Sequence, residues 1–353
     1  MTRVGIAGAG AIALGSAAWL ARAGHPVTLW APRGPAPEAL RQGPLHALGV
    51  VEAEAGVRVA DDAAGLCDQA EVLLVAVPAN GHKAVADALL PHLRSGQVVI
   101  VSSMASLSSL YLFEQARARG VDLTVASFGT TVLTARREAP DRVRVMTLRQ
   151  RLAVSALPLS RTAAMQSLCT QLFGDRFDAH ANDLAAALTN INPAAHGPLA
   201  IFNWTRIERA EAWPQYHYMT PQVASVIERL DAERQALAQA FGLTVRTIEA
   251  HFAHSFGTTS TRLADIAAEL HAKRGGPPGP TDPGTRFLAE DMPYGLVFAL
   301  ALGRVAGLAL PATQAIVDAA SLITGRDFAA GNDLLQPLAL ERESIAGLLR
   351  RVG

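Results

Sequence analysis

The sequence predicts an α/β N-terminal domain followed by an all-α C-terminal domain. A glycine-rich turn lies between a short apolar segment and an apolar helical segment at the start of the chain. Short β-type segments then alternate with helical segments as far as Ala181. From Asn182 onward the apolar residues recur almost throughout at helical spacing. We therefore expect two domains, at residues 1–181 and 182–353, which suits a chain of 353 residues.

The composition argues against several classes of protein. Lys and Arg number 31 and Asp and Glu number 31, so the formal net charge is zero and neither a nucleic-acid partner nor an acidic membrane surface is indicated. The longest apolar run, at residues 295–310, is interrupted by Arg304, so we expect no membrane span. Cys67 and Cys169 form neither a metal-binding spacing nor a disulfide framework. Their number favours a cytoplasmic location and no metal site.

The glycine-rich turn has the spacing GxGxxA and is made of Gly8, Ala9, Gly10, Ala11, Ile12 and Ala13. A strand is expected at residues 3–7, a helix up to residue 23 and a second strand at residues 27–30. In this context the first glycine allows a tight turn, the second lets the backbone approach a pyrophosphate, and Ala13 lets helix and strand pack closely. The helix N-terminus attracts the anion. The turn therefore predicts a Rossmann dinucleotide-binding domain, with a purely structural glycine turn as the alternative.

Arg3 and the apolar stretch to Leu20 also resemble a signal peptide. The glycine spacing, and the strand-like segment that follows directly, favour the dinucleotide site instead.

The end of the second strand indicates which cofactor is bound. It reads Trp30-Ala31-Pro32-Arg33, without the acidic residue that usually holds the ribose hydroxyls of NAD. The forked donors of Arg33 suit a 2′-phosphate, although a solvated surface arginine is the simpler alternative. The sequence therefore favours NADP(H) and leaves NAD(H) open.

The rest of the first domain continues the alternation. Pro78 follows a predicted strand at residues 72–77, on the sheet edge where cofactors lie, and is predicted to contact the cofactor. Residues 142–147 and 151–156 look like two antiparallel strands joined by a short turn at Arg149. Other strands are expected at residues 57–59, 98–102 and 123–127, and helices at residues 82–93, 106–119 and 161–173.

The segment 182–203 is the centre of the second domain. It is rich in Ala and Leu but carries Asn192, His196 and Asn203, and Pro193 should end or kink its helix near Asn192. Asn192 and His196 are four apart, so they share a face if helical geometry holds. Buried polar groups must be hydrogen-bonded or line a cavity. A satisfied core histidine beside a capping asparagine is the alternative to a site.

The remaining helices are expected at residues 220–241, 249–256, 261–271, 293–307 and 312–324. Thr220 should cap the first of them, with Pro221 at its first helical position and Gly242 at its end. Its charged residues are most simply solvated and locally paired: Asp231, Glu233 and Arg234.

A Gly/Pro-rich loop at residues 273–284 leads directly into Arg286 and Asp291. A loop of that length inside a helical domain is disordered or functional. Asp291 could instead cap a helix beginning near Pro293, and Arg286 could be a surface residue.

Together these segments resemble the octopine/nopaline dehydrogenase family of opine dehydrogenases over nearly the whole chain. The resemblance rests on GAGAIA at residues 8–13, NINPAAH at 190–196 with Asn203, LDAER at 230–234 and RFLAEDMPYGL at 286–296. It implies an NAD(P)H-dependent enzyme that joins an amino acid or amine to a 2-oxo acid such as pyruvate and reduces the resulting imine. Its acid/base histidine matches His196, its partner aspartate Asp291 and its substrate arginine Arg286. Asn192 and Asn203 are further candidates for substrate contacts.

The chemistry requires these residue types. Imine reduction needs a group that titrates near neutrality. A carboxylate fixes the imidazole tautomer and stabilises its cation. An arginine fork holds a substrate carboxylate. The chain departs from many family members at Ser127-Phe128-Gly129, where they carry an acidic residue, so a strongly cationic amine is disfavoured.

Two other functions remain open. The opening also resembles ketopantoate reductases, which use a lysine on the helix that opens their second domain, but the lysines here, Lys83 and Lys273, lie outside residues 182–203. A non-catalytic NADP(H)-binding regulatory protein would need no acid/base pair. The sequence leaves the oligomeric state open and is compatible with a homodimer.

Overall fold

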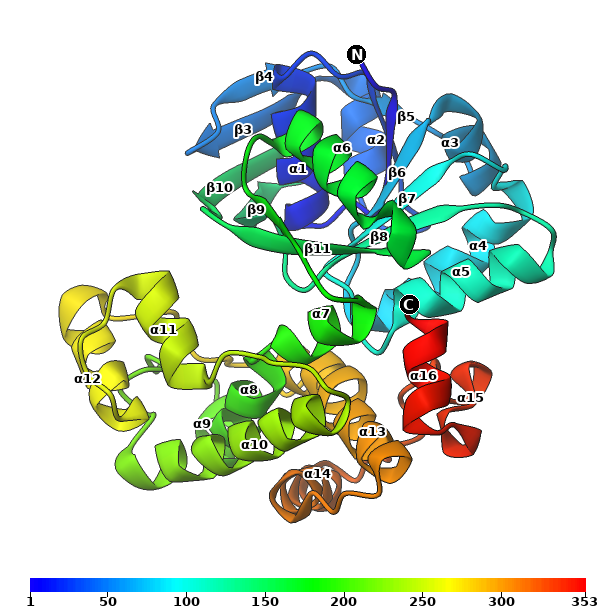
Figure 1. The fold of residues 1–353 in the computed structure, drawn as a ribbon. Coiled ribbons are helices and arrows are strands. Elements are labelled where there is room, and N and C mark those ends of the chain that lie inside the picture. Colours follow the sequence, from blue (N-terminus) through cyan, green and yellow to red (C-terminus); the bar gives the residue numbers. More distant parts are fainter. The chain divides into compact units, whose positions relative to one another are not determined.

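The computed structural model describes residues 1–353, apart from the side chain of Arg274. The chain forms two compact units (Figure 1): Met1–Ala187 together with Arg350–Gly353, and Leu188–Leu349. The first unit is α/β and the second is helical, so the predicted fold class is confirmed. The division falls inside helix α7 (Asp183–Thr189) rather than before Asn182.

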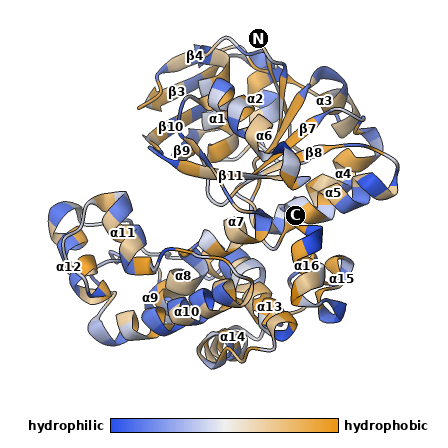
Figure 2. Ribbon diagram, viewed as in Figure 1, coloured by the Kyte–Doolittle hydropathy of each residue, from blue (hydrophilic) through white to orange (hydrophobic). Residues whose placement is uncertain are grey.

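The first unit is built on an eight-stranded sheet with the order β12-β11-β8-β7-β6-β1-β2-β5. The strands from β5 to β8 in this order are parallel, and β11 runs antiparallel to β8. Figure 2 shows mainly hydrophobic residues on β7 and β8, as expected for parallel strands covered on both faces. The bounds are β1 (Val4–Ala7), β2 (Val27–Trp30), β5 (Arg58–Val59), β6 (Val72–Val75), β7 (Val98–Ser102), β8 (Thr124–Phe128), β11 (Leu152–Leu157) and β12 (Phe177–Ala179).

The crossovers between these strands are mostly helical, as parallel strands require. The helices of this unit are α1 (Ala11–Arg22), α2 (Ala36–Gln42), α3 (Ala63–Gln69), α4 (His82–Leu89), α5 (Ser108–Ala118) and α6 (Thr162–Phe173). The strands and helices predicted for the first domain lie where expected to within a few residues, whereas α2 and α3 were not predicted.

A second, four-stranded sheet with the order β4-β3-β10-β9 was also not predicted. The predicted pairing of residues 142–147 with 151–156 is wrong, because these strands belong to different sheets: β10 pairs with β9 and β3, and β11 pairs with β8 and β12. The buried Val143 and Val145 of β10 alternate with exposed arginines. The bounds are β3 (Leu45–Gly49), β4 (Ala53–Ala55), β9 (Leu133–Ala139) and β10 (Arg142–Leu148).

The second sheet packs against α1, beside which it is drawn in Figure 1. The contact is close at Gly15, where an added Cβ would lie 2.9 Å from Leu133 Cδ1 and 3.4 Å from Ala135 Cβ. The outer face of α1 is therefore buried as well as the face toward the large sheet.

A buried carboxylate anchors the start of α7 in the first unit. Asp183 is fully buried and accepts hydrogen bonds from Ser109 of α5, Ser127 of β8 and Ser155 of β11. Ser127, the first residue of the segment 127–129 that lacks the expected acidic residue, thus uses its hydroxyl to bind Asp183. Burial raises the pKa of Asp183, and the three serine hydrogen bonds act in the opposite direction.

The second unit is a set of packed helices around one hydrophobic core. Its helices are α8 (Asn192–Phe202), α9 (Trp204–Glu208), α10 (Pro221–Ala240), α11 (Ile248–Phe256), α12 (Leu263–Arg274), η4 (Phe287–Val297), α13 (Phe298–Ala306), α14 (Pro311–Thr324), α15 (Leu335–Leu338) and most of α16 (Ile345–Arg351). Thr220 precedes α10, but its side chain makes no capping hydrogen bond. Within the described part of the chain, no helix has the length and apolarity needed to cross a bilayer.

The helix predicted at residues 293–307 begins earlier, at Phe287, and Pro293 lies within it. The stretch η4 is a π-helix, whose wider turn accommodates a residue that cannot donate a backbone hydrogen bond. Asn332 Nδ2 donates to the Pro293 carbonyl at 2.9 Å, and Tyr294 Oη donates to Asp333 Oδ1 at 2.9 Å. The alternative in which Asp291 caps a helix starting near Pro293 is therefore wrong.

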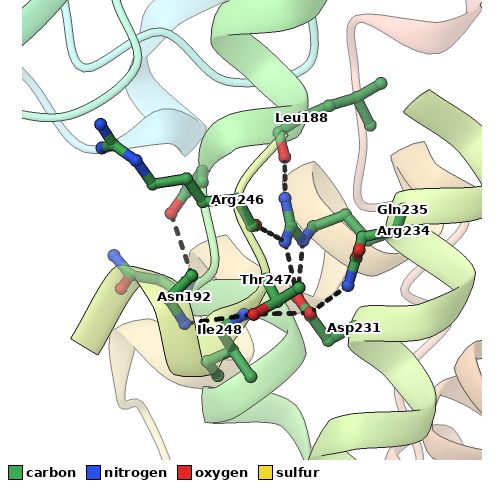
Figure 3. Close-up of polar contacts among 10 residues, drawn as sticks. Leu188, Asn192, Asp231, Arg234, Gln235, Arg246, Thr247 and Ile248 are labelled. Atoms are coloured by element: carbon green, nitrogen blue, oxygen red, sulfur yellow. Dashed lines mark hydrogen bonds and ion pairs between the residues drawn. The ribbon is translucent and has the colours of Figure 1, made fainter. Parts of the chain in front are cut away.

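The prediction that Asp231, Glu233 and Arg234 are solvated is also wrong. Asp231 and Arg234 are buried, and Nε and Nη2 of Arg234 both donate to Asp231 Oδ1 (Figure 3). Arg234 also donates to the carbonyls of Leu188 and Arg246. Asp231 Oδ2 accepts from Gln235 Nε2 and Ile248 N. This network holds the end of α7 and the α10–α11 connection against α10. Glu233 has a different role: it caps α14 by accepting hydrogen bonds from the backbone N–H groups of Ala312 and Thr313.

The Asp183 anchor leads to a prediction about stability and pH. Because its pKa is raised on folding, the native protein takes up a proton on acidification before the unfolded chain does. The contribution of Asp183 to the free energy of unfolding is fully present at a pH below its pKa in the unfolded chain. It is lost as the pH rises through its pKa in the folded protein. Wild type should therefore gain stability relative to Asp183→Asn on acidification from neutral pH, as measured by urea unfolding. Asp183→Ala, which leaves three buried hydroxyls without their acceptor, should lose about 2–4 kcal/mol at every pH. A wild-type protein that loses stability relative to Asp183→Asn on acidification would contradict this account.

Candidate active site

The break before α8 places His196. Helix α7 ends at Thr189 and α8 begins at Asn192, with Pro193 in the first turn, where its missing N–H is not needed. Asn190 Oδ1 accepts from the backbone N–H of Asn192 at 3.1 Å. The predicted interruption near Asn192 is confirmed. His196 follows one turn into the new helix, on the same face as Asn192.

The fold brings His196 and Asp291 together, although they are 95 residues apart in the sequence. His196 Nδ1 lies 2.8 Å from Asp291 Oδ2, and the two side chains are 16% and 7% exposed. An ionised carboxylate can only accept a hydrogen bond, so Nδ1 carries the proton and Nε2 is the nitrogen that can exchange one with another molecule. The expected meeting of the two residues is confirmed.

The ring of Phe287 stacks on the imidazole of His196, with ring centroids 3.7 Å apart and planes 6° from parallel. The aspartate therefore holds one edge of the imidazole and the phenyl ring covers one face. Sequence reasoning did not single out Phe287. Its position four residues before Asp291 in the same helical segment was the available signal, because residues at that spacing share a helix face.

The helices that carry the pair approach closely because each has a glycine at the contact. An added Cβ at Gly295 of η4 would lie 2.3 Å from Pro193 Cγ, and one at Gly197 of α8 would lie 2.8 Å from Leu296 Cδ1. Real Cβ atoms do not come so close to other atoms. The distance between α8 and η4, and with it the His196–Asp291 hydrogen bond, therefore depends on small residues at both positions.

The other predicted substrate residues differ in their surroundings. Arg286 directly precedes η4, and its side chain is 58% exposed, with Nε 4.0 Å from Glu290 Oε1. Asn203 is buried at the end of α8, and its Nδ2 donates to the Leu199 carbonyl at 3.0 Å. Asn192 is partly buried. A substrate contact from Asn203 would therefore use Oδ1 or the second Nδ2–H, and the substrate roles of all three residues stay predictions.

The glycine turn of the first unit has the geometry of a phosphate cradle. Gly8 has φ +134°, and an added Cβ would lie 2.3 Å from the Ala76 carbonyl oxygen, so only glycine fits. A Cβ at Gly10 would meet no atom within 4 Å, so the backbone that leads into α1 is open to a ligand. Ala11 and Ile12 form the first turn of α1 and Ala13 is buried against the sheet. These residues fit a dinucleotide pyrophosphate.

The remaining cofactor candidates, Arg33 and Pro78, are exposed and follow the carboxyl ends of β2 and β6. Nearby, His82 is fully enclosed, with Nδ1 2.8 Å from Ser108 Oγ and Nε2 3.2 Å from the Val77 carbonyl. Burial lowers the pKa of His82 to about 4. His82 is thus a neutral core histidine, in contrast to the partly exposed His196.

A Rossmann unit with an open glycine cradle, and a helical unit with a carboxylate-held histidine, define the chain as an NAD(P)-dependent oxidoreductase. Residues 180–324 match the NAD/NADP octopine/nopaline dehydrogenase alpha-helical domain, and residues 4–158 match the ketopantoate reductase PanE/ApbA model. The helical part of the chain thus resembles the octopine/nopaline dehydrogenase family, and its Rossmann part resembles ketopantoate reductases.

Individual relatives agree with this assignment. An opine dehydrogenase from Arthrobacter sp. (strain 1C) is 29% identical over 282 residues, covering 79% of this chain and 78% of the relative. Protein ocs from Agrobacterium tumefaciens (strain Ach5) is 24% identical over 99% of both chains. A structure of octopine dehydrogenase with NADH and L-arginine has a TM-score of 0.80 and 18% identity, covering 99% of this chain and 98% of the other.

The glycine contacts at the pair lead to a test of its geometry. Gly295→Ala should force α8 and η4 apart, because the added Cβ would overlap the rigid ring of Pro193. We expect a loss of about 1–3 kcal/mol in the free energy of unfolding and a lower kcat. Gly43→Ala is the control, since a Cβ there meets no atom within 4 Å and the φ of −164° suits alanine. Equal stability and kcat in Gly295→Ala and wild type would refute the close approach.

Proposed function

We propose that this protein is an opine dehydrogenase that condenses an amino acid or amine with a 2-oxo acid such as pyruvate and reduces the imine with NADPH in preference to NADH. The hydrogen bond between His196 and Asp291 carries the proposal, because it supplies an oriented acid/base group within the helical domain of the family. Structures that the chain resembles hold NADH with L-arginine, pyruvate or agmatine, which supports the general pairing of an amino compound with a 2-oxo acid but not the cationic side chains of the first and last.

The cofactor preference rests on the end of β2. The sequence has no acidic residue between Trp30 and Arg33, and the exposed Arg33 is available to a 2′-phosphate. A related fold with a TM-score of 0.75, yersinopine dehydrogenase, is known with NADP⁺ bound. The glycine turn Gly8–Ala13 and Pro78 would hold the rest of the dinucleotide.

Proton transfer falls to the imidazole of His196. The amine adds to the oxo-acid carbonyl and water leaves, which gives the imine. Bound NAD(P)H supplies a hydride to the imine carbon. Protonated His196 donates from Nε2 to the imine or to its precursor, while Asp291 holds Nδ1–H and stabilises the cation. In the oxidative direction neutral His196 accepts a proton at Nε2. The stacked Phe287 keeps the imidazole plane fixed throughout.

Substrate binding is assigned to three polar residues of the same helical unit. Arg286, one residue before Phe287, would bind the oxo-acid carboxylate with its planar fork, and Asn192 and Asn203 would contribute amide contacts. Because residues 127–129 carry no acidic residue and Ser127 itself binds Asp183, a strongly cationic amine is disfavoured. We also propose a cytoplasmic location, supported by the unpaired, buried Cys67 and Cys169. A homodimer stays an expectation.

The reaction is tested by NADPH oxidation with pyruvate, glyoxylate or 2-oxoglutarate, each with and without a panel of amino acids. We expect oxidation only when oxo acid and amine are both present. Oxidation with an oxo acid alone would favour a ketopantoate-reductase-like activity. Lys83 and Lys273 pair with Asp87 and Glu269 on their own helices, α4 and α12, which argues against a lysine at this site. Binding of NADPH without turnover of any mixture would favour a regulatory protein.

The His196–Asp291 pair generates a kinetic prediction. His196→Ala should lower kcat about 10²–10⁴-fold, the usual contribution of a positioned acid/base group. Asp291→Asn should lose much of the same factor, and the double variant should lose less than the product of the two, because the residues act as a unit. Reduction consumes a proton, so the oxidative pH optimum should lie above the reductive one. Rates measured against pH for the four proteins provide the check; fully multiplicative losses would mean that the two residues act independently.

A further inference from the structure

The second sheet places a cation beside the dinucleotide turn. Arg137 of β9 donates from Nη1 to the carbonyl of Ala9 at 3.3 Å. Ala9 lies between the two glycines of the turn and directly precedes Gly10, the N-cap of α1. The guanidinium therefore comes from a part of the chain 128 residues away in the sequence and lies at the N-terminal end of the helix that begins the dinucleotide site.

The register of β9 explains why this residue reaches the turn. Alternate residues of a strand share a face, which groups Leu133, Ala135 and Arg137. The first two contact α1 at Gly15. In the pairing with β10, Ala135 lies opposite Val145 and Arg137 opposite Val143, and both valines are fully buried. The face that carries Arg137 is thus the face that packs on α1.

Its neighbour Arg136 is on the other face. It lies opposite Arg144, whose side chain is paired with Glu138. The two arginines are adjacent, both exposed and both on β9, but only Arg137 contacts the glycine turn. Arg136 is therefore a matched control.

The position of Arg137 bears on the electrostatics at the N-terminus of α1. The N-terminus of a helix carries a partial positive charge, so a cation placed there is unfavourable unless an anion lies beside both. The first turn of α1 contains no acidic residue that would serve. A dinucleotide pyrophosphate would supply that anion. A guanidinium that already uses one N–H on the Ala9 carbonyl still has other N–H groups for phosphate oxygens.

We propose that Arg137 is a cofactor-binding residue that contacts the pyrophosphate of the bound dinucleotide at the N-terminus of α1. The assignment rests on the proposed use of NAD(P)H and adds to it a residue from outside the Rossmann sheet. It differs from the role given to Arg33, because the pyrophosphate is common to NADH and NADPH whereas the 2′-phosphate is not. The second sheet is then part of the cofactor site as well as a cover for α1.

The test is direct binding of NADPH and of NADH, measured by calorimetry without substrates, so that turnover is not needed. Arg137→Ala should weaken both cofactors by the same factor, about tenfold or more, which corresponds to one charge-assisted hydrogen bond. Arg137→Lys should restore part of the loss because it keeps the charge but not the fork. Arg136→Ala should bind both cofactors like wild type, and Arg33→Ala should weaken NADPH alone.

Other patterns would overturn the assignment. Weakening of NADPH alone in Arg137→Ala would move the contact to the 2′-phosphate, and unchanged binding of both cofactors would leave Arg137 a structural support of the turn. Equal losses in Arg136→Ala and Arg137→Ala would indicate only a general effect of positive charge. Thermal unfolding of the free proteins must show that Arg137→Ala folds like wild type. If it does not, the binding of NADPH and NADH is compared between Arg137→Lys and wild type instead. A wild-type protein that binds neither cofactor would refute the proposed function itself.

Discussion

The hydrogen bond between His196 and Asp291 depends on how closely α8 and η4 approach one another. Hydrogen bonds tolerate only a few tenths of an ångström, so His196 and Asp291 can pair only if the helix backbones are held at the right distance. Glycine at positions 197 and 295 permits that distance, because an added Cβ would overlap Leu296 and Pro193 respectively. The π-helical turn that accommodates Pro293 belongs to the same constraint, because it sets where Asp291 and Phe287 point. The proposed acid/base pair is thus a product of packing as much as of the two residues themselves.

Much of the first unit and the central pair could be predicted because the signals are local or tied to a specific motif. The spacing of Gly8 and Gly10 indicates positions where the backbone needs glycine. Apolar runs such as residues 98–102 identify buried parallel strands. Pro193 marks its own helix boundary. The meeting of His196 with Asp291 could not come from periodicity. It followed from the resemblance of two distant segments to one family, and only the fold supplies the 2.8 Å distance.

What sequence reasoning missed depends on partners far away in the chain. β9 and β10 have strand-like patterns, but their assignment to a second sheet depends on α1 offering a small surface at Gly15. Asp231 and Arg234 look like surface charges because a helix wheel does not show the carbonyls of Leu188 and Arg246 that approach them. The segment 127–129 likewise lacks an expected acid, whereas its first residue, Ser127, completes the environment of a buried one, Asp183. In each case a polar residue is explained by a group from another element.

The path of the chain also has a consequence for the order in which the protein is made. The Rossmann unit includes residues 350–353, and Arg351 forms a bidentate ion pair with Glu114 of α5. During synthesis, residues 1–187 emerge long before this partner exists, and all of residues 188–349 are translated in between. At the usual 5–20 residues per second this interval lasts roughly 8–30 seconds. The unit with the cofactor turn must therefore persist for that time without its final segment, and its completion coincides with the completion of the helical unit.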